Sequence, residues 1–259
     1  MKTRIISAIV MIALFVPLLI IGEIPYLVMT TVLAVMGMWE LMRLEKLPIV
    51  MKIVSYLVCA FLIISSYVIK DFNPFNYYIM LGLFLLYSSL MIINNDIENY
   101  SYKDSLWLLI GTLMLGFMFK NFVDIRYVGM YEVIYLFLIS TMTDTFALFC
   151  GKLFGKHKLT KISPNKTVEG SVGGSIFGTI IPVLFLFFLG REITLTIILE
   201  TFLLTIIGQI GDLYFSSIKR HYDVKDFSNL IPGHGGILDR LDSIIFCIIT
   251  FGVLLTILV

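Results

Sequence analysis

Charged and polar side chains gather in one short stretch near the end of the chain, residues 216–242, between two strongly apolar runs. The stretch reads SSIKRHYDVKDFSNLIPGHGGILDRLD and combines carboxylates, lysine and arginine side chains, and a glycine-rich turn. Carboxylates suit hard metal ions, cationic side chains suit phosphates, and glycines let a backbone approach an anion closely. Because charges beside an apolar membrane core are costly, this cluster is a candidate functional site.

Helical spacing predicts that several of these groups share a face. The run GQIGDLYFSSIKRHY is expected to continue the preceding apolar helix beyond the membrane. Residues three, four, seven and eight apart then line one stripe, which comprises Asp212, Ser216, Lys219 and Arg220. After the turn, a new helix is expected to carry Asp239 and Asp242 on one face of its N-terminus. The two helices could thus present three carboxylates and a hydroxyl to one point.

A metal and phosphates together explain this combination of charges. Unpaired carboxylates repel one another, and Mg²⁺ removes that cost by binding one or two of them together with substrate phosphates. The remaining phosphate oxygens would be neutralised by cationic side chains: Lys219, Arg220, Lys225 and Arg240. The backbone at Gly235 and Gly236, beside His234, could also approach an anion. A salt-bridge network at the membrane edge, closed by a glycine turn, is the structural alternative.

A second region, residues 144–170, adds an acid and a basic loop. Asp144 lies inside an apolar run, so we expect it to face the bundle interior, either bound to metal or in a helix–helix hydrogen bond. The lysines from Lys152 to Lys161 fit an ordinary cytoplasmic loop equally well. Lys166 differs, because it stands with Ser163 and Thr167 in a turn that leads into a helix. A helix N-terminus preceded by such groups is a phosphate site.

The composition predicts what must position these groups. The 259 residues are 59% hydrophobic and 14% charged, with a mean hydropathy of +0.97, whereas soluble domains are about 45–50% apolar and about 25% charged. The chain is therefore expected to be a polytopic integral membrane protein, all-α because the backbone must satisfy its own hydrogen bonds in the bilayer. The sequence contains no block of basic residues with interleaved aromatic residues, which would have suggested a nucleic-acid partner. The three cysteines form neither a disulfide framework nor a metal set.

About nine segments are long enough to span, since a span needs about 20 apolar residues. They are approximately 5–22, 24–41, 49–69, 77–95, 105–119, 131–149, 171–190, 193–211 and 243–259, of which the fifth is the shortest. We predict a less specific N-terminal region of transmembrane helices, residues 1–130. A catalytic region, residues 131–259, follows with charged loops at 150–170 and 212–242.

Charge placement predicts the orientation. With the N-terminus in the cytoplasm, all but four of the 19 Lys and Arg residues lie inside, in accord with the positive-inside rule. Both charged loops then face the cytoplasm, where nucleotides are available. Among the other polar residues, Glu40 is expected to pair with Arg43 at the interface, and His157 and His221 to lie on the surface. Glu200 has no predicted role.

The motif in residues 216–242 resembles the signature of the phosphatidate cytidylyltransferases (CDP-diacylglycerol synthases). That pattern is S-x-hydrophobic-K-R, then K-D, then P-x-H-G-G-hydrophobic-x-D-R-x-D. The fixed positions are Ser216, Lys219, Arg220, Lys225, Asp226, Pro232, His234, Gly235, Gly236, Asp239, Arg240 and Asp242. The upstream runs G-K-L-F-G-K-H and S-P-x-K-T-x-E-G, with Asp144 and Asp212, are similar as well. The resemblance covers roughly residues 130–259. The sequence departs from the family pattern at Phe146 and Leu148, where Gly and Tyr are expected.

The resemblance implies that CTP and phosphatidate are converted to CDP-diacylglycerol and pyrophosphate, in phospholipid biosynthesis. It also implies dependence on Mg²⁺, with a second cation left open, a homodimer, and a multi-pass enzyme of the cell membrane whose site faces the cytoplasm. In this sequence, the residues that would bind the metal are Asp212, Asp239 and Asp242, with Asp144 as a fourth. The phosphates would be held by Lys166, Lys219, Arg220, Lys225 and Arg240, near Ser163, Thr167 and Ser216.

An ion-coupled membrane transporter that uses the intramembrane acids is the alternative from another functional class. It predicts acids spread over the membrane depth and helices broken near the midplane. Here the acids gather at one edge, which favours an enzyme that meets a soluble nucleotide and a lipid headgroup.

Overall fold

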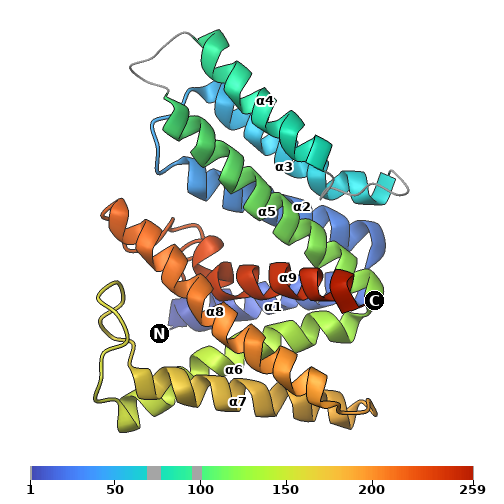
Figure 1. Cartoon of the computed structure of the whole chain (residues 1–259), viewed down its shortest axis with the longest axis vertical. Coiled ribbons are helices and arrows are strands. Elements are labelled where there is room, and N and C mark those ends of the chain that lie inside the picture. The colour runs from blue at the N-terminus through green and yellow to red at the C-terminus, as the bar shows by residue number, and fades with distance from the viewer. Residues whose placement is uncertain (1, 69–76, 95–100, 259) are drawn as a thin grey trace. The chain divides into compact units, whose positions relative to one another are not determined.

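In the computed structural model, residues 2–68, 77–94 and 101–258 are described, and over these ranges the chain forms nine α-helices (Figure 1). They are α1 (Lys2–Ile21), α2 (Glu23–Met42), α3 (Ile49–Val68), α4 (Tyr77–Asn94), α5 (Tyr102–Val128), α6 (Met130–Phe154), α7 (Val168–Phe188), α8 (Leu195–His221) and α9 (Leu238–Leu258). Outside the helices, the only β-structure in these ranges is two isolated β-bridges. The predicted all-α class is confirmed.

Six of the described helices, α1, α2, α5, α6, α7 and α8, are long and apolar enough to cross a membrane. Shorter apolar stretches occur at Ile49–Ser65 and Tyr78–Leu90. The predicted segment ends at residues 69, 95 and 259 lie outside the described residues. The chain is a helical membrane protein, as its composition predicted.

The prediction that the fifth segment is short was wrong, because α5 runs for 27 residues. Counting apolar residues had stopped the segment before Lys120, but Lys120 forms an ion pair with Asp124 one turn later. Such a pair at i and i+4 supports a helix at its polar end. The helix therefore continues beyond its apolar core to Val128.

Contacts between Cα atoms divide the chain into two compact units. The first unit combines Met1–Asp124 with the short segment Asp226–Leu238. The second combines Ile125–Lys225 with Asp239–Val259. The glycine-rich turn thus belongs with the N-terminal helices, although the sequence places it between α8 and α9.

In the first unit, hydroxyl groups join buried helices. The Tyr87 hydroxyl of α4 lies 3.0 Å from Ser55 Oγ of α3 and 2.7 Å from Thr112 Oγ1 of α5. All three side chains are buried. Because a hydroxyl in an apolar interior needs a partner, this cluster fixes α3, α4 and α5 in one register.

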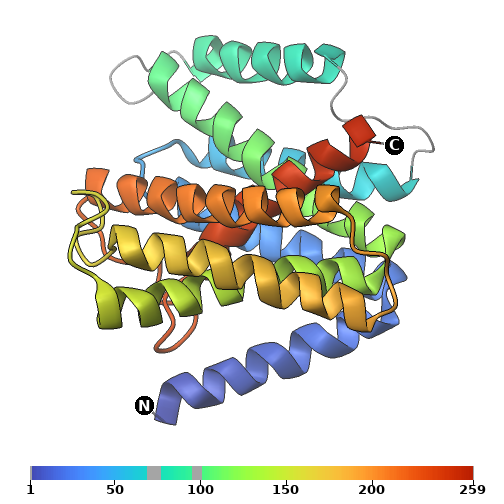
Figure 2. The ribbon, with the colours of Figure 1, turned by 60° about the horizontal axis from the view of Figure 1, so that its bottom comes forward.

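In the second unit, α6 and α7 pack closely side by side, with α8 along α7 (Figures 1 and 2). Gly170 and Gly174 lie on the face of α7 that touches α6. A Cβ at Gly174 would lie 2.7 Å from the Thr143 carbonyl oxygen, and one at Gly170 2.6 Å from that of Ala147. Small residues four apart permit such approach between membrane helices. On the other side, Gln209 Nε2 of α8 donates to Ser175 Oγ of α7 at 2.9 Å.

The connection between α6 and α7 is built by its own hydrogen bonds. Leu159 N donates to the Lys166 carbonyl oxygen, and Val168 N to that of His157, both at 2.9 Å. Thr167 Oγ1 caps α7 by accepting from Gly170 N at 3.1 Å. At the same end, Glu169 accepts from His157 Nδ1 at 2.6 Å. These bonds hold Lys166 at the start of α7.

Candidate functional site

Lys166 and Asp212 form an ion pair between the α6–α7 connection and α8. The turn that precedes α7 presents the lysine, since Lys166 N donates to the Ser163 carbonyl oxygen at 3.1 Å. Both side chains are mostly buried, with 28% and 22% exposed. Lys166 was predicted to bind phosphate and Asp212 to bind metal. The fold brings these two residues, 46 positions apart in the sequence, into direct contact.

The predicted polar stripe on α8 is present. Ser216 Oγ donates to Asp212 Oδ1 at 3.3 Å, one turn along the helix. Lys219, a further turn on, donates to Asp239 Oδ1 of α9 at 2.7 Å. Its side chain is 12% exposed and that of Asp239 only 2%, so this is a buried ion pair. The stripe joins α8 to the N-terminal turn of α9.

Three aspartates from three helices act on one another electrostatically. The charge of Asp212 on α8 acts on both Asp144 of α6 and Asp242 of α9. Ser243 lies between the last two, because its Oγ is 3.4 Å from Asp144 Oδ2 and its backbone N–H donates to Asp242 Oδ1 at 2.9 Å. We call Asp144, Asp212 and Asp242 the aspartate cluster. Asp239 instead pairs with Lys219.

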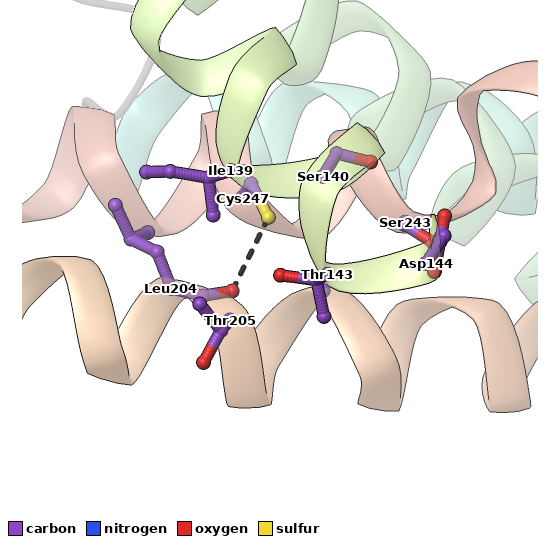
Figure 3. A pocket seen from close by; sticks show the side chains of 9 residues that line it. Ile139, Ser140, Thr143, Asp144, Leu204, Thr205, Ser243 and Cys247 are labelled. Atoms are coloured by element: carbon purple, nitrogen blue, oxygen red, sulfur yellow. Dashed lines mark hydrogen bonds between the residues drawn. The ribbon is translucent and has the colours of Figure 1, made fainter. Parts of the chain in front are cut away.

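A small pocket borders Asp144 between α6, α8 and α9 (Figure 3). Its walls include Thr143, whose Oγ1 is buried without a hydrogen-bond partner, and Cys247, whose Sγ lies 3.3 Å from the Leu204 carbonyl oxygen. Almost no space in it is open to a water-sized molecule, whereas ligand pockets usually have volumes of about 300–1,000 Å³. This pocket is therefore too small for a nucleotide or a lipid headgroup.

The chemistry of the aspartate cluster fits a hard divalent cation, because all of its donors are carboxylate oxygens. Within the described ranges, however, no three His, Cys, Asp or Glu side chains are arranged to hold one metal ion together. Lysine ammonium groups instead lie on Asp212 and on Asp239. These two ion pairs are also what a salt-bridge network at the membrane edge would contain.

The other predicted phosphate ligands of the second unit lie at its surface. Arg220, Lys225 and Arg240 are exposed. His157 and His221 are exposed as well, as predicted. Glu200 is half-buried within α8.

In the first unit, the glycine-rich turn is a tight loop held by α1. Ile231 N donates to the Gly235 carbonyl oxygen at 2.8 Å, and Gly235 has a φ of +82°, which favours glycine. From α1, Ser7 Oγ lies 2.7 Å from His234 Nδ1 and 3.0 Å from the Pro232 carbonyl oxygen. His234 and the turn are thereby held against α1.

Glu40 is a residue whose partners the sequence did not reveal. Its predicted ion pair with Arg43 was wrong: Arg43 lies over the Trp39 ring at 5.1 Å. The Glu40 carboxylate, fully buried, accepts from Ser228 Oγ at 2.6 Å and from the backbone N–H groups of Ile237 and Leu238 at 2.8 Å each. An acid in an apolar helix was the available signal, but its partner Ser228 is 188 positions away.

Comparison with known proteins extends the resemblance to the whole chain. The model of the cytidylyltransferase family matches residues 2–258. A phosphatidate cytidylyltransferase of Staphylococcus aureus (strain COL) is 34% identical over 98% of this chain and 99% of its own length. One of Bacillus subtilis (strain 168) is 33% identical over 95% of this chain and 94% of its own. The chain therefore belongs to the cytidylyltransferase family.

Proposed function

We propose that the chain transfers the cytidylyl group of CTP to phosphatidate, which yields CDP-diacylglycerol and pyrophosphate. The relatives named phosphatidate cytidylyltransferase align over almost the full length of both chains. The observation that carries the proposal is the aspartate cluster of α6, α8 and α9, flanked by the partly buried lysines Lys166 and Lys219. Such a site suits the joining of two polyanions.

The reaction needs positioning and charge neutralisation more than a strong base. An ionised oxygen of the phosphatidate phosphate attacks the α-phosphorus of CTP, the new O–P bond forms, and the bond to the β-phosphate oxygen breaks in line. The electron pair leaves with pyrophosphate. Because such transfers depend chiefly on electrostatic stabilisation, the ammonium groups of Lys166 and Lys219 would bind phosphate oxygens of the substrates. The exposed Arg220, Lys225 and Arg240 would add further cationic charge.

We assign the metal to the carboxylates. The candidate ligands are Asp144, Asp212, Asp239 and Asp242, and the oxygen donors favour Mg²⁺. When bound, the ion would neutralise phosphate charge and polarise the α-phosphate.

The location of the enzyme is also part of the proposal. We place the enzyme in the cell membrane. The positions of its Lys and Arg residues support an orientation in which the α6–α7 connection and the α8–α9 segment face the cytoplasm. We propose a homodimer on the family resemblance. The transporter alternative expects broken helices, whereas α6 and α8, which carry Asp144 and Asp212, are continuous.

The proposal is tested with the purified protein in detergent, supplied with radiolabelled CTP, phosphatidate and Mg²⁺. We expect labelled CDP-diacylglycerol, no product with excess EDTA, and no product from an Asp239→Ala variant. Full activity of that variant would exclude the assigned site. A folded wild-type protein that makes no labelled lipid would exclude the function.

A further inference from the structure

Glu40 is an acid with no exposed surface inside a hydrophobic helix. Removing a carboxylate from water is costly unless hydrogen bonds compensate for it. Here the compensation comes from one segment of chain, since Ser228, Ile237 and Leu238 all donate to it at 2.6–2.8 Å. Hydrogen bonds to an ionised acceptor are short and strong. The Glu40 carboxylate therefore holds the loop from Ser228 to Leu238 through these hydrogen bonds. We call this loop the anchor loop.

Both ends of the anchor loop pack against the Glu40 carboxylate. Ser228 Oγ, which donates to Glu40, also accepts from Leu230 N at 3.1 Å. At the other end, a Cβ at Gly236 would lie 2.5 Å from Glu40 Oε1 and 2.6 Å from Oε2. The loop backbone thus lies directly against the carboxylate, with no room for a side chain at that position.

The same contacts fix where α9 begins. Leu238 is the first residue of α9, and its N–H is one of the helix-end donors that have no partner within the helix. Glu40 supplies that acceptor from α2 and places negative charge at the positive end of the helix dipole. One turn earlier in α2, a Cβ at Gly37 would lie 3.2 Å from Leu238 Cδ2, so the first residue of α9 is also packed tightly.

Asp239 directly follows Leu238, and Asp242 lies one turn further along α9. Because a helix is rigid over one turn, a shift or rotation at Leu238 would be passed to both carboxylates. Neither carboxylate is bonded by Glu40 itself, so any effect of Glu40 on the reaction must act through the backbone.

We propose that Glu40 is a positioning residue for the transfer reaction: its buried carboxylate holds the anchor loop and sets the start of α9, and so the placement of Asp239 and Asp242. The inference rests on the proposed function. It gives the N-terminal helices a part in the reaction that the motif in residues 216–242 does not suggest.

The central variant is Glu40→Gln, which keeps the size of the side chain but removes its charge and replaces an acceptor oxygen with a donor. Loss of a group that orients metal-binding side chains typically costs roughly 10–100-fold in activity or metal affinity. We expect kcat to fall by that factor and the Mg²⁺ requirement to rise, with a smaller change in the KM for CTP. Ser228→Ala removes one donor of three and should give a weaker effect in the same direction.

The matched control is Glu132→Gln. Glu132 is also a buried acid, 5% exposed, but it pairs with Arg191 at the far end of α6 from Asp144. It should retain wild-type kcat and the wild-type Mg²⁺ requirement. Thermal unfolding of all variants in detergent shows whether each is folded.

Hydrogen–deuterium exchange supplies a readout that does not depend on activity. The amides of residues 228–238 should exchange faster in Glu40→Gln than in wild type, and those of α6 should not. Unchanged exchange in this loop would overturn the anchoring, whatever the activity assay shows. Wild-type kcat in folded Glu40→Gln, or in Ser228→Ala should the first variant not fold, would overturn the positioning role and leave the proposed function intact. An inactive wild-type protein would instead contradict the proposed function.

Discussion

At the scale of single residues, the pair Lys219–Asp239 shows how much helical spacing can predict. The spacing placed Asp212, Ser216 and Lys219 on one stripe, and the structure confirms this through the Ser216–Asp212 hydrogen bond. It could not show that Lys219 and Asp239 contact each other, because the turn between their helices has no period. Of the three carboxylates grouped together, Asp212 and Asp239 each pair with a lysine, whereas Asp242 accepts from the Ser243 backbone N–H.

This pair carries a stability prediction. Removing one partner of a buried ion pair leaves an uncompensated charge and costs about 3–5 kcal/mol. Lys219→Met should therefore lower the thermal unfolding temperature in detergent, and Lys219→Met with Asp239→Asn should recover part of the loss. Both proteins should be inactive. If the double variant is as unstable as the single one, the ion pair is not the source of the stability.

At the scale of helices and loops, apolar runs located every described helix, whereas their polar ends were misjudged. The apolar count stopped the fifth segment at residue 119, but the Lys120–Asp124 pair carries α5 on to Val128. Glu40 shows the opposite limit: a local reading paired it with Arg43, and only the folded chain brings Ser228 to it. Contacts between distant segments leave no trace in periodicity.

The close approach of the anchor loop to α2 predicts that Gly236 tolerates no side chain. A Cβ there would meet the Glu40 carboxylate at 2.5 Å, so Gly236→Ala must displace the loop or the acid. We expect a loss of activity like that of Glu40→Gln and faster proteolysis within residues 228–238. Gly82→Ala in α4 is the control, because nothing lies within 4 Å of a Cβ at that position. Wild-type activity of Gly236→Ala would show that this contact is not rigid.

At the scale of the whole molecule, composition predicted a membrane protein and charge asymmetry predicted its orientation. The composition could not reveal that Asp226–Leu238 packs with the N-terminal helices, because that association depends on hydrogen bonds to Glu40 and Ser7. Residues of the N-terminal helices therefore hold part of the motif.

The orientation is testable by labelling single cysteines, after the natural Cys59, Cys150 and Cys247 are replaced by serine. Lys158 and Glu192 are both exposed and lie at opposite ends of α7. A cysteine at 158 should react with a membrane-impermeant maleimide only in inside-out vesicles, and one at 192 only in right-side-out vesicles. The reverse pattern would place the aspartate cluster away from cytoplasmic CTP.

Cytidylyl transfer itself is tested by following each phosphate of CTP. Purified protein with phosphatidate and Mg²⁺ should move label from α-³²P CTP into a lipid and label from γ-³²P CTP into pyrophosphate, and Asp212→Asn should do neither. Transfer of the γ-label to lipid, or equal lipid labelling by folded Asp212→Asn, would contradict a cytidylyltransferase site at the aspartate cluster.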